Sequence, residues 1–389
     1  MGKKGLNRKA AVKLTSDGFS IHTFEASFQC TNLGWKNIKD QLYEELAKRD
    51  LQEKAWIYAA NKKRSRYVCT RYSDHGVRIT LEHNSSASAM GSYYIRMVIN
   101  PRKLLDPDSS YLGILKPTED AAKKISKAFR KLFRDTPFEE ELSCYYLTRV
   151  DVCTNIECDN AKIFRELIRA TQKQPAPPKL ERQFYTSPDR KKEARYNKHY
   201  IRYACKSYEL VMYDKTYQLT EEGLDLSYEK FPEGVLRYEL RMNREYIHTL
   251  EKRYKTKDAI EFLQTAVDEA MPLLFTKFYD NFPPDQYWCL GELLKKLWDS
   301  PYPEYLKRKM IDIAELTSEC SGVDEAFQKL GSSKDERKQL LQKFRELGLS
   351  PVPLRKNFSA EWIPAPTYLL YQFAKGEAEI VYIPYVRIK

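Results

Sequence analysis

Apolar and polar residues alternate with a period of two over most of the chain from Gly18 to Pro101. This alternation is typical of strands that bury one face and expose the other. Polar or glycine-containing breaks divide it into five segments, at 20–28, 54–60, 65–72, 76–83 and 93–100. We therefore expect one antiparallel sheet in this part of the chain.

A helical spacing replaces the alternation in two places. Ile38, Leu42 and Leu46 recur every four residues in the segment 37–50, which predicts an amphipathic helix. The segment 117–135 begins with Pro117, has acids in its first turn and ends with cations, as the helix dipole favours. Its predicted polar face is strongly basic.

The second half of the chain mixes both patterns. Strands are predicted at 145–158, 209–215 and 235–243, and a helix at about 160–172 is followed by the proline-containing linker KQPAPPK. Helical patterns, including one at 259–279, fill most of 244–349, and an apolar strand is predicted at 379–386.

Together these elements predict an α+β fold, with antiparallel sheets covered by helices and a mainly helical C-terminal region. We predict three domains: a β-rich domain with two helices over 1–135, a second domain over 136–255 and a helical domain over 256–389. The last helices and the final strand could form a winged-helix-like module that reads DNA, or only a packing domain.

The 389-residue chain is basic and rich in tyrosine. It has 66 Lys and Arg against 54 Asp and Glu, a net charge of +12, and 28 tyrosines. Cations neutralise phosphates and aromatic faces stack on unpaired bases, so this composition suits a nucleic-acid-binding protein. Taken alone, composition favours the simpler interpretation that the tyrosines are half-buried with hydrated hydroxyl groups.

Several classes of protein are disfavoured. No apolar run approaches the roughly 18 residues of a membrane span, and the basic start lacks the apolar block of a signal peptide, so we expect a cytoplasmic protein with no membrane contact. The eight cysteines include no CxxC pair, and we expect reduced thiols. The sequence also lacks the motifs of ATP-driven enzymes, α/β-hydrolases and zinc proteases.

Three predicted strands carry the candidate chemistry, because each has one apolar and one polar face. The polar faces hold Arg149, Asp151, Cys153 and Asn155 in the first strand, Val211, Tyr213 and Lys215 in the second, and Arg237, Glu239 and Arg241 in the third. Polar side chains from all three strands could therefore meet on one surface.

Such a surface suits attack on a phosphodiester. A tyrosine hydroxyl between Lys and Arg side chains can be activated towards phosphorus, which would leave a phosphotyrosine link. Asp151 and Glu239 could hold Mg²⁺ or Mn²⁺, which prefer carboxylate oxygens. No two histidines are separated by a single residue, so a metal site would depend mainly on carboxylates. The simpler interpretation is that both acids form ordinary ion pairs on a solvated face and that Tyr213 is one more half-buried aromatic.

The order of these strands resembles the trans-acting replication initiators of rolling-circle plasmids and their relatives in phages and integrative elements. The resemblance covers about 143–250, and its motifs are LTRVDVCTNI, KSYELVMYDKTYQL and VLRYELRMN. It implies a metal-dependent endonuclease and strand transferase that nicks one DNA strand at an origin and rejoins it. Tyr213 would be the nucleophile, and Asp151 and Glu239 would hold the metal. The cations implied to steady the phosphate are Lys215, Arg149 and Arg237.

The chain departs from the plasmid members before the tyrosine, where the sequence Cys205-Lys206-Ser207 replaces a Gly-Ser-Arg lead-in. Tyr208 and Tyr203 therefore remain alternative nucleophiles. The cation- and tyrosine-rich segment 181–206 is predicted to be a mobile loop that binds the DNA strand, and a solvated charged loop is an equal alternative. The residues predicted to bind DNA are Arg195, Lys198, Arg202, Lys206 and Ser207.

The implied partners are double-stranded and single-stranded origin DNA, a host helicase and a polymerase, and a homodimer is one assembly compatible with this function. The competing hypothesis is a non-enzymatic, sequence-specific DNA-binding regulator, in which the carboxylates only position arginines. A third hypothesis is an RNA-binding protein that stacks bases on its tyrosines.

Overall fold

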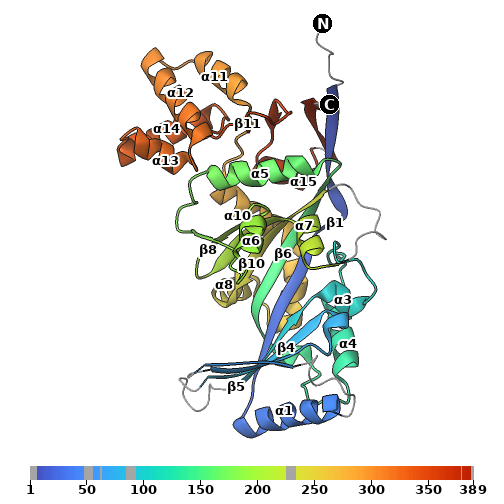
Figure 1. Ribbon diagram of the computed structural model, residues 1–389. Helices are drawn as coiled ribbons and strands as arrows, with labels where there is room; N and C mark the ends of the chain where they lie inside the picture. Colours follow the sequence, from blue (N-terminus) through green and yellow to red (C-terminus); the bar gives the residue numbers. More distant parts are fainter. Residues whose placement is uncertain are drawn as a thin grey trace.

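Figure 1 shows the computed structural model of the chain, which describes residues 7–47, 56–61, 64–84, 93–224, 234–377 and 379–386. One large antiparallel sheet and a set of helices make up this part of the chain, and most of the helices lie in the C-terminal half of the sequence. The predicted α+β class is therefore confirmed. Residues 48–50 of the predicted helix at 37–50 and residues 54–55 of the predicted strand at 54–60 lie outside the described residues.

The large sheet has 11 strands within the described ranges. Their order is β2-β3-β4-β5-β1-β6-β10-β9-β8-β7, and β13 pairs with β1. Their bounds are β1 (Asn7–Gln29), β2 (Trp56–Asn61), β3 (Arg64–Cys69), β4 (Val77–Asn84), β5 (Tyr93–Ile99), β6 (Tyr146–Cys158), β7 (Glu181–Gln183), β8 (Tyr200–Ala204), β9 (Tyr208–Asp214), β10 (Gly234–Asn243) and β13 (Ile380–Val386). A separate two-stranded sheet consists of β11 (Tyr287–Trp288) and β12 (Trp362–Ile363).

Some of the helices pack against the large sheet, whereas α11 to α14 lie away from it (Figure 1). The described helices are α1 (Asn32–Ala47), α3 (Pro101–Leu105), α4 (Ala121–Phe133), α5 (Ala161–Lys173), α6 (Arg190–Asn197), α7 (Lys215–Glu221), α8 (Arg244–Tyr254), α9 (Ala259–Asp268), α10 (Ala270–Asn281), α11 (Leu290–Trp298), α12 (Glu304–Glu319), α13 (Val323–Lys329), α14 (Lys334–Glu346) and α15 (Pro366–Ala374). Helices α5, α9 and α10 contact the central strands. None of the described helices is long and apolar enough to cross a membrane.

The long strand β1 connects the parts of the sheet. Its C-terminal half pairs with β5 on one side and with β6 on the other, and its N-terminal half pairs with β13 and β6. The pairing with β6 is irregular between Leu14 and Phe19 and again between Ile21 and Thr23. One sheet therefore includes strands from all three predicted domains, and the division into domains stays a prediction.

The three motif strands β6, β10 and β9 are neighbours in the sheet. Val152, Leu240 and Leu210 are paired across them and are buried in the core, which also contains Phe278 of α10. The polar residues of the motifs alternate with these apolar residues and lie on the opposite face. The predicted division of β6 and β10 into an apolar and a polar face is therefore confirmed.

Two predictions about the motif region are wrong. The segment 181–206 is not a loop, because it forms β7, α6 and β8, and β8 pairs with β9. Lys215 is not a strand residue but the first residue of α7. The Asp214 side chain caps this helix by accepting a hydrogen bond from Tyr217 N at 2.9 Å, which ends β9 one residue earlier than the alternation suggests.

The C-terminal region is helical as predicted, with two differences. The predicted helix at 259–279 breaks at Glu269 into α9 and α10. The final strand, β13, pairs with β1, where Ile383 lies opposite Ala10 and both are buried. This strand belongs to the main sheet and is not the wing of a winged helix, because its apolar residues are buried against β1 rather than against the last helices.

Candidate active site

Backbone pairing aligns the polar side chains of the motif strands in rows across the sheet. The three rows, read from β6 through β10 to β9, hold Asn155, Arg237 and Tyr213; Cys153, Glu239 and Val211; and Asp151, Arg241 and Glu209. Successive rows are about 7 Å apart, which is two residues of strand. The structure therefore brings Tyr213, Glu239 and Asp151 to one face in three consecutive rows.

Tyr213 and Glu239 form the centre of this cluster. The Tyr213 hydroxyl donates a hydrogen bond to Glu239 Oε1 at 2.6 Å, and both side chains are buried. Burial raises the pKa of Tyr213 well above its usual value of 10, and the neighbouring carboxylate raises it further. The phenol is therefore neutral in this arrangement.

Two further side chains contact the Glu239 carboxylate. Arg241 donates to Oε2 from Nε at 3.0 Å and from Nη2 at 2.8 Å, and His22 Nδ1 lies 3.0 Å from Oε1. Burial opposes ionisation, but Arg241, His22 and Arg237 outweigh it and hold the pKa of Glu239 well below its usual 4.5. Burial and Arg237 lower the pKa of His22 to about 3, so its imidazole is neutral at pH 7.

Asp151 lies one row from Glu239 and is 2% exposed. Its carboxylate accepts hydrogen bonds from Arg149 Nε at 3.0 Å and from the Thr23 hydroxyl. Burial raises the pKa of Asp151, while Arg149 and Arg241 oppose the increase and the charge of Glu239 adds to it. The two carboxylates therefore interact and belong to one polar site.

Lys215 reaches the same region from the start of α7. It is 5% exposed, and its Nζ donates to Gln218 Oε1 at 3.0 Å and lies 6.0 Å from the centre of the Tyr213 ring. Burial and the positive charge of Arg237 lower the pKa of Lys215 to about 7, against a usual value of 10.5. The ammonium group can therefore release its proton near neutral pH.

Arg237 is fully buried and binds protein groups. Its Nε donates to Asn155 Oδ1 at 2.8 Å, and its Nη2 donates to the carbonyl oxygen of Leu112 at 2.5 Å. These bonds attach the segment around Leu112 to the polar face of the sheet. Arg237 does not reach solvent, so in this arrangement it positions its neighbours rather than meeting a phosphate.

A series of tyrosines extends from the site to α6. The ring centroids of Tyr213 and Tyr200 are 6.2 Å apart, those of Tyr200 and Tyr196 are 5.3 Å apart, and those of Tyr196 and Tyr185 are 4.2 Å apart. Burial raises the pKa of Tyr196 and of Tyr200. Tyr200 of β8 therefore lies next to Tyr213, and Tyr196 of α6 packs against Tyr200.

Sequence reasoning missed four residues of this site: His22, Thr23, Tyr196 and Tyr200. Alternation in 20–28 predicts a strand around His22 and Thr23, but no local signal shows that this strand pairs with β6. The irregular pairing between Ile21 and Thr23 is what places two consecutive residues near the two carboxylates.

Arg195 and Lys198, two of the residues predicted to bind DNA, are exposed on α6 and just after it. They lie at the end of β8 where Tyr200 pairs with Tyr213. The structure therefore places these two cations beside the tyrosine end of the site.

The other three residues predicted to bind DNA lie along β8 and at its far end. Arg202 donates to the Glu209 carboxylate at 2.9 and 2.6 Å. Lys206 forms an ion pair with Glu245, and Ser207 follows it in the turn between β8 and β9. These residues do not join Arg195 and Lys198 in one cluster.

Tyr203 and Tyr208, the alternative nucleophiles, lie on the other face of the sheet. Tyr203 is 1% exposed and packs against Phe282, with ring centroids 5.6 Å apart. Tyr208 packs against Tyr246 at 5.7 Å. Tyr213 is the one tyrosine of the three whose hydroxyl meets a motif carboxylate within the described residues.

The carboxylates do not fit a divalent ion as they are arranged. Within the described ranges, no group of three or more His, Cys, Asp or Glu side chains is placed to hold a metal ion. Each oxygen of Asp151 and Glu239 already has a protein donor or imidazole nitrogen beside it, and an arginine stands against each carboxylate. Mg²⁺ or Mn²⁺ could bind here only after Arg149 and Arg241 moved away.

Comparison with models of known protein families found no match to this chain, and a search of curated proteins found none either. The resemblance to rolling-circle initiators therefore depends on the three short sequence motifs.

Proposed function

We propose that the chain is a replication initiator that nicks and rejoins one DNA strand through a covalent link between Tyr213 and a 5′ phosphate. The observation that carries the proposal is the hydrogen bond of 2.6 Å between Tyr213 and Glu239, which joins a nucleophile to a proton acceptor. The motif order and the basic, tyrosine-rich composition support the same function.

The proposed step begins when the Tyr213 oxygen attacks the phosphorus of one DNA strand. A tyrosyl O–P bond forms, the bond from phosphorus to the 3′ oxygen breaks, and the phenol proton moves to Glu239. Lys215, with a pKa of about 7, gives a proton to the departing 3′ oxygen. Rejoining is the reverse step, in which the 3′ hydroxyl attacks the phosphotyrosine.

In the resting arrangement Glu239 is a weak base, because Arg241 donates to it twice. An entering phosphodiester competes for Arg241 and Arg149, whose side chains are 23% and 30% exposed. When these guanidinium groups move from the carboxylates to the phosphate, the basicity of Glu239 rises as a proton must be accepted. The same two arginines then stabilise the charge that develops on the phosphate oxygens.

The proposed substrate is origin DNA, with single-stranded DNA at the cleaved position, and the free 3′ hydroxyl would prime synthesis by a host polymerase behind a host helicase. Arg195 and Lys198 lie where they could bind the backbone of a strand that enters past the tyrosines of α6. Such entry requires the side chains around Tyr213, which include Tyr200, to move, because Tyr213 is 3% exposed.

The test uses a negatively supercoiled plasmid that carries the DNA surrounding the coding sequence. We expect nicked plasmid with protein attached covalently to the 5′ end. The adduct is detected as a change in the electrophoretic mobility of the DNA that persists in SDS. Tyr213→Phe should abolish this adduct, and Tyr208→Phe, on the other face of the sheet, should leave it unchanged. An unchanged adduct yield with Tyr213→Phe would contradict the proposal.

The second candidate function is a DNA-binding regulator that does not cut. The burial of the neutral Tyr213 phenol favours it, because a nucleophile must reach its substrate. Binding to the plasmid without any nick, in Mg²⁺, in Mn²⁺ and without a divalent ion, would support the regulator and reject the tyrosyl mechanism. Strong weakening of binding by salt is expected for both functions.

A further inference from the structure

The last two helices of the α12, α13 and α14 unit are joined by a connection of the length found in a helix–turn–helix. Their connection is the segment 330–333, in which Gly331 has a φ of +63°. A turn of three or four residues that contains glycine is typical of this motif, and glycine adopts such a φ without strain. We propose that this unit binds duplex DNA with α14 in the major groove, a sequence-reading function separate from the nicking site.

Buried apolar side chains and exposed ion pairs hold α14 in the unit. Leu340 and Phe344 of α14 are buried in the core. Ion pairs join Glu336 to Lys309 of α12 and Arg337 to Asp324 of α13. Burial of Leu340 and Phe344 therefore anchors α14, and the two exposed ion pairs join it to α12 and α13. A recognition helix must be anchored to keep its register on DNA.

The start of α14 is also well defined. Ser333 caps the helix by accepting a hydrogen bond from Glu336 N at 3.2 Å. This serine with a glutamate three residues later has the spacing of a capping box. The first turns of α14, which carry the base contacts in a helix–turn–helix, are therefore ordered before any DNA binds.

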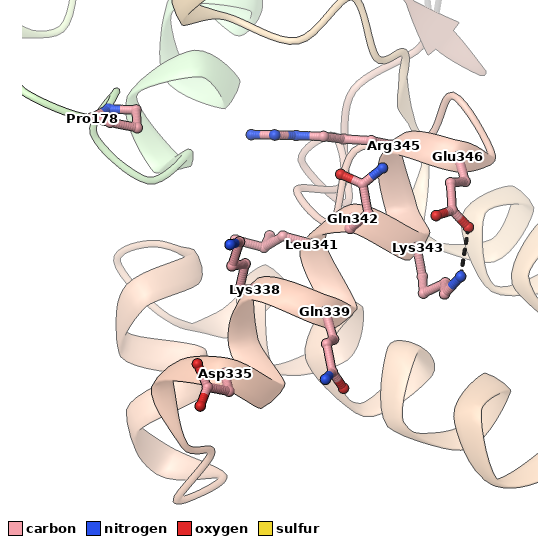
Figure 2. A pocket seen from close by; sticks show the side chains of 9 residues that line it. All are labelled: Pro178, Asp335, Lys338, Gln339, Leu341, Gln342, Lys343, Arg345 and Glu346. Carbon is pink, nitrogen blue, oxygen red and sulfur yellow. Dashed lines mark hydrogen bonds and ion pairs between the residues drawn. The ribbon is translucent and has the colours of Figure 1, made fainter.

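The outer face of α14 is exposed and polar. Its exposed side chains are Lys334, Asp335, Lys338, Gln339, Gln342, Arg345 and Glu346. Figure 2 shows most of these side chains beside an open hollow of about 1000 Å³, with Lys338 and Arg345 extending from the helix towards the side on which Pro178 lies. These side chains are therefore accessible from solvent.

Duplex DNA fits this face better than a protein partner does. Lys334 and Lys338 form no ion pair within the described part of the chain, while Glu346 is already bound by Lys343 and Tyr302. A protein interface needs apolar or aromatic anchors at its centre, and the exposed side chains of α14 include none. The unpaired lysines instead complement a phosphate backbone.

The amide side chains supply the chemistry for reading bases. Gln339 and Gln342 each carry a donor and an acceptor that can pair with the N6 and N7 atoms of adenine in the major groove. Lys338 lies beside them and can donate to guanine or to a phosphate. A 13-residue helix is about 20 Å long and about 10–12 Å wide, which matches the width of the major groove.

The test is selection of bound duplexes from a random-sequence library by the full-length protein. We expect the wild type to enrich one short motif. Gln339→Ala combined with Gln342→Ala should lose discrimination at the bases that these residues read, with each lost contact worth about a tenfold preference or more. Lys338→Ala should weaken binding to all sequences and reduce its salt dependence.

Controls separate this proposal from the nicking proposal. Lys257→Ala, at an exposed lysine outside the three-helix unit, should select the wild-type motif with the wild-type affinity. Tyr213→Phe should also select that motif, so a failure of the nicking mechanism would leave this result intact. The glutamine variant must keep the wild-type melting temperature, because its residues are exposed. Either no enriched motif for the wild type or an unchanged motif for the glutamine variant would overturn the proposal.

Discussion

Tyr213 and Arg241 donate hydrogen bonds to the two different oxygens of one carboxylate, that of Glu239. The phenol contacts Oε1 at 2.6 Å, and the guanidinium contacts Oε2 at 2.8 and 3.0 Å. Because Glu239 is fully buried, its charge depends on these partners rather than on water. A change in Tyr213 or Arg241 must therefore alter the proton affinity of Glu239, and a change in Glu239 must alter that of Tyr213.

Glu239→Gln should remove the proton acceptor without changing the size of the side chain. We expect the rate of covalent adduct formation to fall by about 10²–10⁴, the range for loss of a general base, while DNA affinity is retained. Single-turnover measurement of the adduct checks this. The matched variant is Glu209→Gln, one row away on the same face, which should keep most of the activity. A wild-type rate in Glu239→Gln would exclude Glu239 as the base.

Arg241→Ala should leave the buried Glu239 carboxylate without its cation and lower the free energy of unfolding by about 3 kcal/mol. Mn²⁺ should then raise the melting temperature of the variant, because Oε2 of Glu239 has lost its protein donor and only Arg149 remains to be displaced before an ion can bind to both carboxylates. Mn²⁺ should raise the melting temperature of the wild-type protein without DNA by less. Thermal melting with and without Mn²⁺ measures both effects, and an equal increase in the two proteins would show that Arg241 does not block the ion.

Lys215→Met should stabilise the protein more at low pH than at high pH. Below the folded-state pKa of about 7, Lys215 is charged in both the folded and the unfolded chain. Burial of this charge then lowers the free energy of unfolding. From pH 7 to the unfolded-state value of 10.5 only the unfolded chain keeps the proton, and wild-type stability rises with pH. The advantage of the variant should therefore shrink over this interval. Urea unfolding across it provides the measurement, with Lys116→Met at an exposed site as control.

Arg237→Met should destabilise the fold although it removes a buried charge. The change leaves Asn155 Oδ1 without its donor and takes the charged donor away from the Leu112 carbonyl, which keeps only its hydrogen bond from Asn155 Nδ2, and each of these two losses costs about 1–3 kcal/mol. We expect a total loss of about 2–5 kcal/mol in chemical denaturation. Arg195→Met on the exposed side of α6 should change stability by less than about 0.5 kcal/mol. Equal stabilities of the two variants would show that Arg237 does not anchor the Leu112 segment.

Several parts of the candidate site follow from sequence pattern alone. Alternation along β6 and β10 predicts that Asp151 and Glu239 lie opposite Val152 and Leu240, and the structure confirms this division of faces. The motif order favours Tyr213 over Tyr203 and Tyr208, but sequence reasoning could not exclude the two alternatives. Strand pairing decides the geometry, because it sends both alternatives to the apolar face.

Other parts could not be predicted from a local pattern. Lys215 is expected on a strand face, and the Asp214 cap instead makes it the first residue of a helix. His22 and Thr23 reach the carboxylates because of an irregular pairing between β1 and β6, strands separated by more than a hundred residues. The alternation of a strand contains no information about such a distant partner.

The amino-acid sequence by itself determined most of the strands and helices, although not β7, α6 and β8, together with the polar face of β6 and β10 and the residue types available for chemistry. These properties are local, since they depend on the spacing of side chains over a few residues. Only the tertiary structure decided that Tyr213, Glu239 and Asp151 occupy adjacent rows, that arginines already neutralise both carboxylates, and that β13 completes the main sheet. Register between distant strands depends on burial of apolar side chains from the whole chain, and no single segment specifies it.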